Sequence, residues 1–200
     1  MHYISDILYW ISTGLLVPVI LLLIYFFCRS LLMVGGFFGQ YLDTRRTHLR
    51  TQEHLRTLTP DNLDDFWAEL PAKSRSLFMR HLKELQQSEG SPARIEKVVA
   101  DFEAAADKEL TPSKMLAKMG PMFGLMGTLI PMGPALVGLS TGDIASMAYN
   151  MQVAFATTVV GLFSSAVGFA VQQIKRRWYV EEMNQLVFVA ELLKEKHSGQ

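Results

Sequence analysis

The chain has 200 residues, half of them hydrophobic, and its 19 Lys and Arg residues balance 19 Asp and Glu residues to a formal net charge of zero. This balance gives no bulk electrostatic reason to expect a nucleic-acid partner, and the single cysteine excludes a framework of internal disulfides. The charges are clustered, so that long stretches of the chain nearly lack them.

Three apolar stretches indicate the class of protein. They cover residues 7–27, 119–139 and 144–171, and each is as long as the roughly 20 residues that a membrane-spanning helix needs. The sequence therefore predicts an all-α integral membrane protein with three transmembrane helices and long cytoplasmic helical extensions. No Lys or Arg precedes the first stretch, as one would in a secretory signal, so we expect this span to be retained.

Basic residues stand at one end only of each apolar stretch, and this predicts the orientation of the spans. Positively charged residues near span ends mark the cytoplasmic side of a membrane. They follow the first stretch, precede the second and follow the third, whereas the opposite ends carry only Asp6 and Asp143. The N-terminus is therefore expected outside, residues 43–112 inside, a tight turn outside and the C-terminus inside.

Residues 1–42 are predicted to form the first span and its extension. The apolar run continues past Arg29, whose long side chain can reach the lipid headgroups. Pro18 and Gly35-Gly36 are the positions where a bend is expected. The span has no polar stripe, so we place it on the lipid side of the assembly.

Residues 43–112 read as a cytoplasmic domain of amphipathic helices. Thr59-Pro60-Asp61 and Ser91-Pro92 have the form of helix starts, and Pro71 and Gly90 the form of helix ends. The apolar stripe Leu77, Phe78, His81, Leu82 and Leu85 lies between them. Such a small bundle is marginal alone, so we expect it to pack against extensions of the membrane helices.

Nothing in the sequence indicates an enzyme, a cofactor or a metal site. His48, His54 and His81 have no partners at zinc-like spacing. The glycines of residues 119–139 do not lie between a strand and a helix, as those of a phosphate-binding loop do. A membrane enzyme is the weakest of the alternatives, because no catalytic set is visible.

Residues 113–175 are predicted to form a hairpin of two membrane helices, each with a face of small and polar residues. On the third span this face is Asn150, Ala154, Thr158, Gly161, Ser165, Gly168 and Gln172, flanked by Thr157 and Ser164. On the second span it is Pro121, Gly124, Thr128, Pro131 and Ala135. Residues 176–200 continue the third span as an amphipathic cytoplasmic helix.

Two interpretations of these faces stay open, helix packing and the lining of a polar path. Small residues and hydroxyls are enriched where membrane helices pack, and an oligomer could use one face for both purposes. We assign Thr128, Thr158, Thr157, Ser165, Asn150 and Gly161 to a pore lining. We assign Gly124, Gly127, Pro131, Ala154 and Gly168 to helix packing.

No Asp, Glu, Lys or Arg lies inside the second or third span. Proton and ion relays in membranes normally use ionisable side chains at membrane depth. If this chain helps to move protons, the titrating group must come from another chain.

The two spans carry motifs that resemble the MotA/TolQ/ExbB proton-channel family, in particular its TolQ/ExbB-like branch. Pro121-Met-Phe-Gly-Leu-Met-Gly-Thr128 is similar to the family's Pro-x-x-Gly-Leu-x-Gly-Thr run. Ala154-Phe-Ala-Thr-Thr-Val-Val-Gly-Leu162 is similar to its Ala-Leu-Leu-Ala-Thr-Ala-Leu-Gly-Leu pattern. The motifs cover roughly residues 118–175, and the rest of the chain matches in layout.

The resemblance implies an ion channel subunit, with the proton as the expected ion, in an energy-transducing motor of the bacterial or archaeal cytoplasmic (inner) membrane. Such proteins form pentameric rings, surrounded by membrane lipid, around two single-span ExbD/TolR-like partners. An aspartate of the partner carries the proton, and Thr128 and Thr158 would face it.

The sequence departs from this family at two places. Val153 stands where relatives often have a glutamate, and Pro131 and Pro134 follow the Gly-Thr motif where relatives usually have no such pair. A non-conducting membrane scaffold with the same fold is therefore an alternative, and Val153 is its best support. The resemblance does not name the process driven or decide between proton and sodium.

Overall fold

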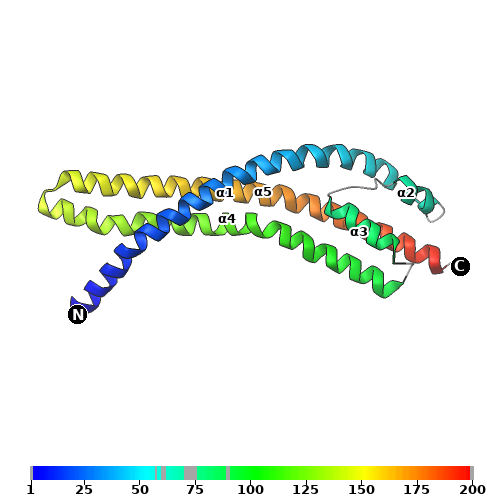
Figure 1. The fold of residues 1–200 in the computed structure, drawn as a ribbon, viewed down its shortest axis with the longest axis horizontal. Coiled ribbons are helices and arrows are strands. Elements are labelled where there is room, and N and C mark those ends of the chain that lie inside the picture. Colours follow the sequence, from blue (N-terminus) through cyan, green and yellow to red (C-terminus); the bar gives the residue numbers. More distant parts are fainter. Residues whose placement is uncertain (1, 57, 60–61, 70–75, 89–90, 199–200) are drawn as a thin grey trace. The chain divides into compact units, whose positions relative to one another are not determined.

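Five helices make up the part of the chain described by the structure, a computed structural model (Figure 1). That part comprises residues 2–56, 58–59, 62–69, 76–88 and 91–198. The helices are α1 (His2–Arg56), α2 (Leu63–Glu69), α3 (Leu77–Gln86), α4 (Pro92–Thr141) and α5 (Ile144–Ser198). The predicted all-helical fold is confirmed for these residues.

The predicted helix boundaries of the polar region are only partly covered. Pro60, Asp61, Pro71 and Gly90 lie outside the described residues. Ser91-Pro92 does mark a helix start, because α4 begins at Pro92 and the Ile95 N–H donates to the Ser91 carbonyl over 3.0 Å. Proline suits this first position, since its missing N–H would have no partner inside the helix there.

Within the described residues, three helices are long and apolar enough to cross a membrane. The candidate spans are Ile7–Phe37 in α1, Pro92–Thr141 in α4 and Ile144–His197 in α5, and they contain the three predicted stretches. α1 continues unbroken through Pro18 and through Gly35-Gly36. The prediction of a three-span membrane protein is therefore confirmed at the level of length and composition.

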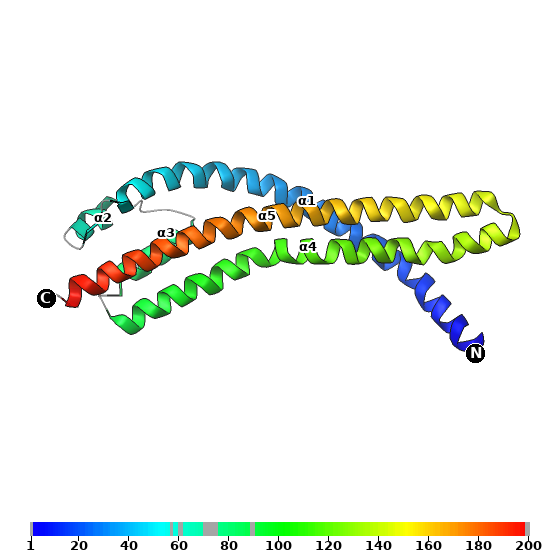
Figure 2. The same cartoon turned by 180° about the vertical axis from the view of Figure 1, so that it is seen from behind.

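The chain divides into two compact units. The first unit comprises Met1–Gly36 and Pro112–Gln172, and the second comprises Phe37–Thr111 and Gln173–Gln200. Within the first unit, α4 and α5 run side by side in opposite directions to the turn that joins them (Figures 1 and 2).

Aromatic contacts place α1 against both helices of this hairpin. The ring of Phe26 lies 5.6 Å from that of Phe123 in α4, measured between centroids. The ring of Phe27 lies 5.7 Å from that of Phe163 in α5. Aromatic pairs at such distances add to the stability gained by burying their area. These two pairs therefore define which side of the hairpin α1 covers.

The turn between α4 and α5 is built by backbone and side-chain caps. Gly142 has a φ of 77°, a left-handed conformation that glycine adopts without the steric cost of a Cβ. The N–H groups of Gly142 and Asp143 donate to the carbonyls of Leu139 and Gly138, which is the hydrogen-bond pattern of a Schellman motif. The Asp143 carboxylate then accepts the Ser146 N–H over 3.0 Å and caps the start of α5.

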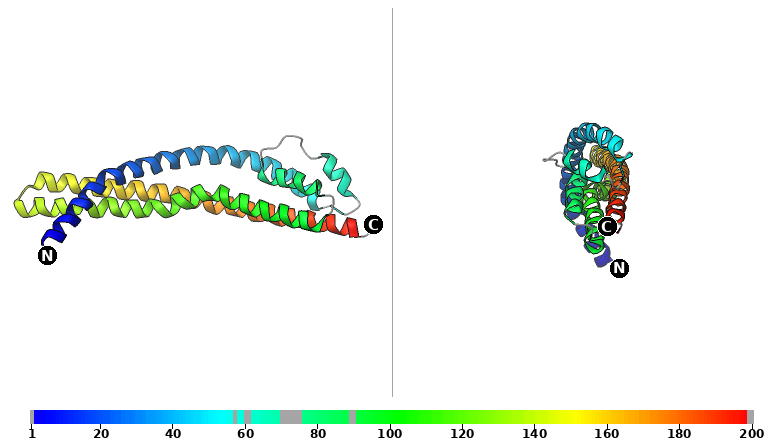
Figure 3. Two further views of the ribbon diagram at one scale, coloured as in Figure 1. Left: turned by 60° about the horizontal axis from the view of Figure 1, so that its bottom comes forward. Right: turned by 90° about the vertical axis from the view of Figure 1, so that its right-hand side faces the viewer.

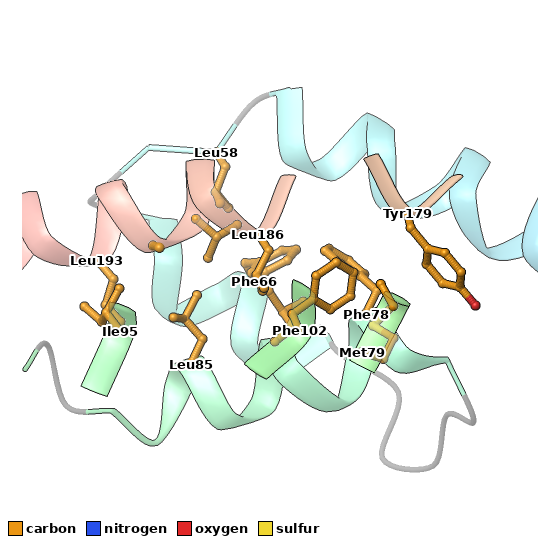
Figure 4. Close-up of a cluster of buried hydrophobic side chains, with 14 of the residues drawn as sticks. Leu58, Phe66, Phe78, Met79, Leu85, Ile95, Phe102, Tyr179, Leu186 and Leu193 are labelled. Atoms are coloured by element: carbon orange, nitrogen blue, oxygen red, sulfur yellow. The ribbon is translucent and has the colours of Figure 1, made fainter. Parts of the chain in front are cut away.

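The second unit has its own apolar core. Side chains from α2, α3, α4 and α5 point toward one another there (Figure 4), and α2 and α3 lie alongside the other two helices (Figure 3). The members with no exposed area are Leu63, Leu82, Leu85, Phe102, Leu186 and Val189. In this core, α2 and α3 of the polar region pack against the parts of α4 and α5 that extend from the membrane helices, as the sequence predicted.

Among the described residues of the second unit, three polar or charged side chains are buried, namely His81, Ser88 and Glu182. His81 is 2% exposed, and its Nδ1 donates to the Leu77 carbonyl over 2.9 Å while its ring meets that of Phe102 edge-on. This placement gives His81 a packing role. Glu182, in the part of α5 that belongs to this unit, is also buried, with 7% of its surface exposed.

Candidate functional site

The two helices of the membrane hairpin approach each other at glycines. A Cβ added to Gly161 would lie 2.7 Å from the Gly120 carbonyl oxygen and 2.8 Å from the Gly124 Cα. A Cβ added to Gly168 would lie 2.7 Å from the Ala117 backbone nitrogen. Real Cβ atoms do not come this close to backbone, so only glycine permits the observed approach. Close backbone packing of this kind is typical of small residues in membrane helices.

The residues assigned to helix packing are all buried in the first unit. They are Gly124, Gly127, Pro131, Ala154 and Gly168. A Cβ added to Gly127 would lie 2.6 Å from the Thr157 Cβ, so Gly127 makes room for a side chain, whereas Gly124 makes room for the backbone of Gly161.

Three of the residues assigned to a pore lining take part in this helix contact. Thr157 is 8% exposed and packs on Gly127. Gly161 is buried against Gly120 and Gly124. Within this single chain, the two residues therefore hold the hairpin together. The third residue, Ser165, donates a hydrogen bond across the interface, to the Ala117 carbonyl over 2.8 Å. Their predicted role in a pore is a separate question, which stays a prediction.

Thr128, Thr158 and Asn150 lie beside the helix contact and are half-buried. Each donates to a carbonyl of its own helix. The Thr128 hydroxyl donates to Leu125 over 2.7 Å, the Thr158 hydroxyl to Ala154 over 3.1 Å, and the Asn150 amide to Ser146 over 2.9 Å. A hydroxyl that donates still has lone pairs with which it can accept. Both threonines can therefore accept a hydrogen bond from a protonated partner.

Thr128 and Thr158 lie on the same side of the hairpin, away from α1. Successive helix residues are rotated by about 100°. Thr128 stands five residues after Phe123, and Thr158 five residues before Phe163, the two aromatics that contact α1. Five steps leave each threonine about 140° around its helix from the side that α1 covers. The hairpin thus presents two hydroxyls on a face that α1 leaves open.

The segments of α4 and α5 that carry this face contain no ionisable Asp, Glu, Lys, Arg or His residue. Lys118 and Asp143 bound the apolar part of α4, and Asp143 and Lys175 bound that of α5. No Asp, Glu, Lys, Arg or His lies between them in either segment. The face can donate and accept hydrogen bonds, but it cannot by itself hold or release a proton near neutral pH.

Three residues that were not assigned to the site, Gly120, Gly138 and Ser164, are also buried in the hairpin of α4 and α5. Gly120 and Gly138 are buried at close approaches, and Ser164 has no exposed area. Gly120 could have been identified because it precedes Gly124 by one helical turn. Among the described residues, no group of three or more His, Cys, Asp or Glu side chains could hold a metal ion.

Comparison with known families identifies the chain. A model of the MotA/TolQ/ExbB proton channel family matches residues 70–187, which is more than half of its length. The chain belongs to the MotA/TolQ/ExbB proton channel family. A comparison with curated proteins found no match.

Membership of the MotA/TolQ/ExbB family defines a channel-type membrane protein, with three apolar helices here. The matched region covers α3, the membrane hairpin and most of α5, so it extends beyond the two motifs at 118–175 on both sides. The resemblance predicted from those motifs is confirmed at the level of the family.

Proposed function

We propose that this MotA/TolQ/ExbB family member is the ion channel subunit of an inner-membrane energy-transducing motor, of the TolQ/ExbB-like branch. Five copies would form a ring around two single-span ExbD/TolR-like partners. The proton is the proposed ion, and a membrane aspartate of the partner would be the group that titrates.

The observation that carries this proposal is the shared orientation of Thr128 and Thr158. Both hydroxyls lie on the hairpin face away from α1, and no ionisable side chain accompanies them in the membrane segments. Such a face suits a path in which another chain supplies the charge. A protonated carboxyl group could donate to the free lone pairs of either threonine as it passes through a low-dielectric environment.

Replacing Thr158 by valine tests the proposal. Valine keeps the shape of threonine but removes the hydroxyl, so Thr158→Val should reduce ion flux to background in liposomes that contain the complex with its partner. The matched control is Thr141→Val, because Thr141 also donates to carbonyls of its own helix but lies at the outer end of α4.

The oligomeric state of both variants decides how a loss of flux is interpreted. The proposal expects the assembly of Thr158→Val to match that of the wild type. If Thr158→Val failed to assemble, its hydroxyl would be a packing element. If it conducted like Thr141→Val, Thr158 would have no part in the ion path.

A non-conducting scaffold of the same fold is the second candidate. It is favoured by Val153, which stands in α5 where an acidic side chain is often present in relatives. Flux measured with and without the partner distinguishes the two functions. Absence of flux in both preparations, with intact rings, would favour the scaffold.

A further inference from the structure

A serine in α5 compensates for a proline in α4. Proline has no backbone N–H, so inside a helix it leaves the carbonyl four residues earlier without its usual donor. Pro121 lies inside α4, and the carbonyl that it leaves free is that of Ala117. The Ser165 hydroxyl donates to this same carbonyl oxygen over 2.8 Å.

Ser165 differs in this respect from the hydroxyls around it. Thr157, Thr158 and Ser164 each donate to a carbonyl of α5 itself, three or four residues back. Ser165 donates to the other helix, 48 residues away in the sequence. A backbone carbonyl without a donor is costly where close helix packing excludes water, as it does at this level of the hairpin. Serine side chains of neighbouring helices are one means of satisfying it.

Glycines on both sides make this hydrogen bond possible. A Cβ on Gly120 would lie 3.0 Å from the Ser165 backbone nitrogen, and a Cβ on Gly168 would lie 2.7 Å from the Ala117 nitrogen. The two helices therefore come close enough for the short serine side chain to reach across. The proline, the serine and both glycines act together at one level of the hairpin.

We propose that Ser165 is a positioning residue, which replaces the donor that Pro121 removes and so fixes the register of α4 against α5 at the Ala117 carbonyl. Thr128 follows Pro121 by seven residues, two helical turns along the same helix. The register set at Ala117 thus determines where the Thr128 hydroxyl lies relative to Thr158. This consequence rests on the proposed function, whereas the hydrogen bond itself does not.

The hydrogen bond is tested by NMR on the full chain in lipid bicelles. Alanine labelled with ¹³C at the carbonyl and lysine labelled with ¹⁵N select the two Ala-Lys pairs of the sequence, 72–73 and 117–118. Ser165→Ala should move the carbonyl resonance of Ala117 upfield, as the loss of a donor does. The matched control is Ser164→Ala, which removes a buried hydroxyl that donates within α5. Equal shifts in both variants would overturn the proposal.

The link to proline is tested by restoring the missing donor. Membrane hydrogen bonds of this kind change an unfolding equilibrium by roughly 3- to 20-fold, and Ser165→Ala should do so in the wild-type chain. In a Pro121→Ala background the Ala117 carbonyl regains an N–H from its own helix, so Ser165→Ala should then have little effect. An equal effect in both backgrounds would mean that Ser165 acts only by packing.

The positioning role is tested by ion flux with the partner present. Flux should fall in Ser165→Ala and recover in the Pro121→Ala, Ser165→Ala double variant. Unchanged flux in Ser165→Ala, with the NMR shift present, would overturn the positioning role. If the wild-type complex does not conduct, the proposed function fails, and the NMR and unfolding measurements still decide whether Ser165 replaces the missing donor.

Discussion

At the scale of residues, two neighbouring threonines of α5 have different surroundings. Thr157 is 8% exposed and packs on Gly127, whereas Thr158, the next residue, is half-buried on the face away from α1. Both hydroxyls donate to carbonyls of α5, so their hydrogen bonds do not distinguish them. Position around the helix does, because neighbouring residues point about 100° apart.

The glycine contact of the hairpin leads to a prediction for Gly161→Ala. The added Cβ would meet backbone atoms of Gly120 and Gly124, which cannot rotate away as a side chain can. We expect the free energy of unfolding to fall by about 1–3 kcal/mol, the usual cost of overpacking. It is measured by unfolding the full chain in bicelles.

Gly133→Ala is the control for this variant. Gly133 also lies in the membrane part of α4, but a Cβ there would meet nothing closer than the Tyr9 Cε2, at 4.0 Å. Its unfolding free energy should stay equal or rise slightly, because alanine favours helix over glycine. If both alanine variants were destabilised to the same degree, the cost would not come from the Gly161 contact.

At the scale of elements, the sequence predicted what depends on one helix at a time. Apolar length predicted the three spans, since a bilayer requires about 20 apolar residues of any crossing helix. Periodicity placed Thr128 and Thr158 on the small-residue faces. The start of α4 at Pro92 was also predictable, from the serine and proline that begin it.

Features that depend on two helices at once could not be predicted in this way. Periodicity tells which residues share a face but not which helix lies opposite or at what register. The bond from Ser165 to Ala117 needed that register, and so did the contact of Gly120 with Gly161. The burial of Glu182 could not be predicted for the same reason, because it depends on which helices of the second unit lie next to α5.

The turn between α4 and α5 carries a prediction of its own. The Asp143 carboxylate caps the Ser146 N–H, so Asp143→Ala should destabilise the start of α5 by about 0.5–2 kcal/mol. Faster amide hydrogen exchange in the first turn of α5 would report this loss. Asp143→Asn keeps an oxygen that can accept the same N–H and should exchange like the wild type. Equally fast exchange in both variants would show that the side-chain charge, and not the cap, holds the turn.

At the scale of the whole molecule, the charge pattern predicts the orientation of the chain in the membrane. Cys28 is the single cysteine, so a Cys28→Ser chain offers a background for introduced cysteines. In intact cells, a cysteine at Ser140 should react with an impermeant maleimide, and one at His197 should react only after the membrane is opened. Both positions are exposed, so burial does not explain a difference. The reverse pattern of labelling would show that the chain has the opposite orientation in the membrane.

The number of chains in the assembly is the last prediction, and it tests the motor directly. A single chain leaves the Thr128 and Thr158 face open, and this face carries no ionisable group. In the proposed motor, further copies and a partner would complete the conducting path. Native mass spectrometry of the complex, gently extracted from its own host membrane, should find five copies of this chain. It should also find two copies of a small single-span protein with a membrane aspartate. Five copies alone would support the ring and leave the supplier of the charge to be found. A monomer or dimer that is stable in mild detergent would contradict the ring, and the scaffold would then be the better proposal.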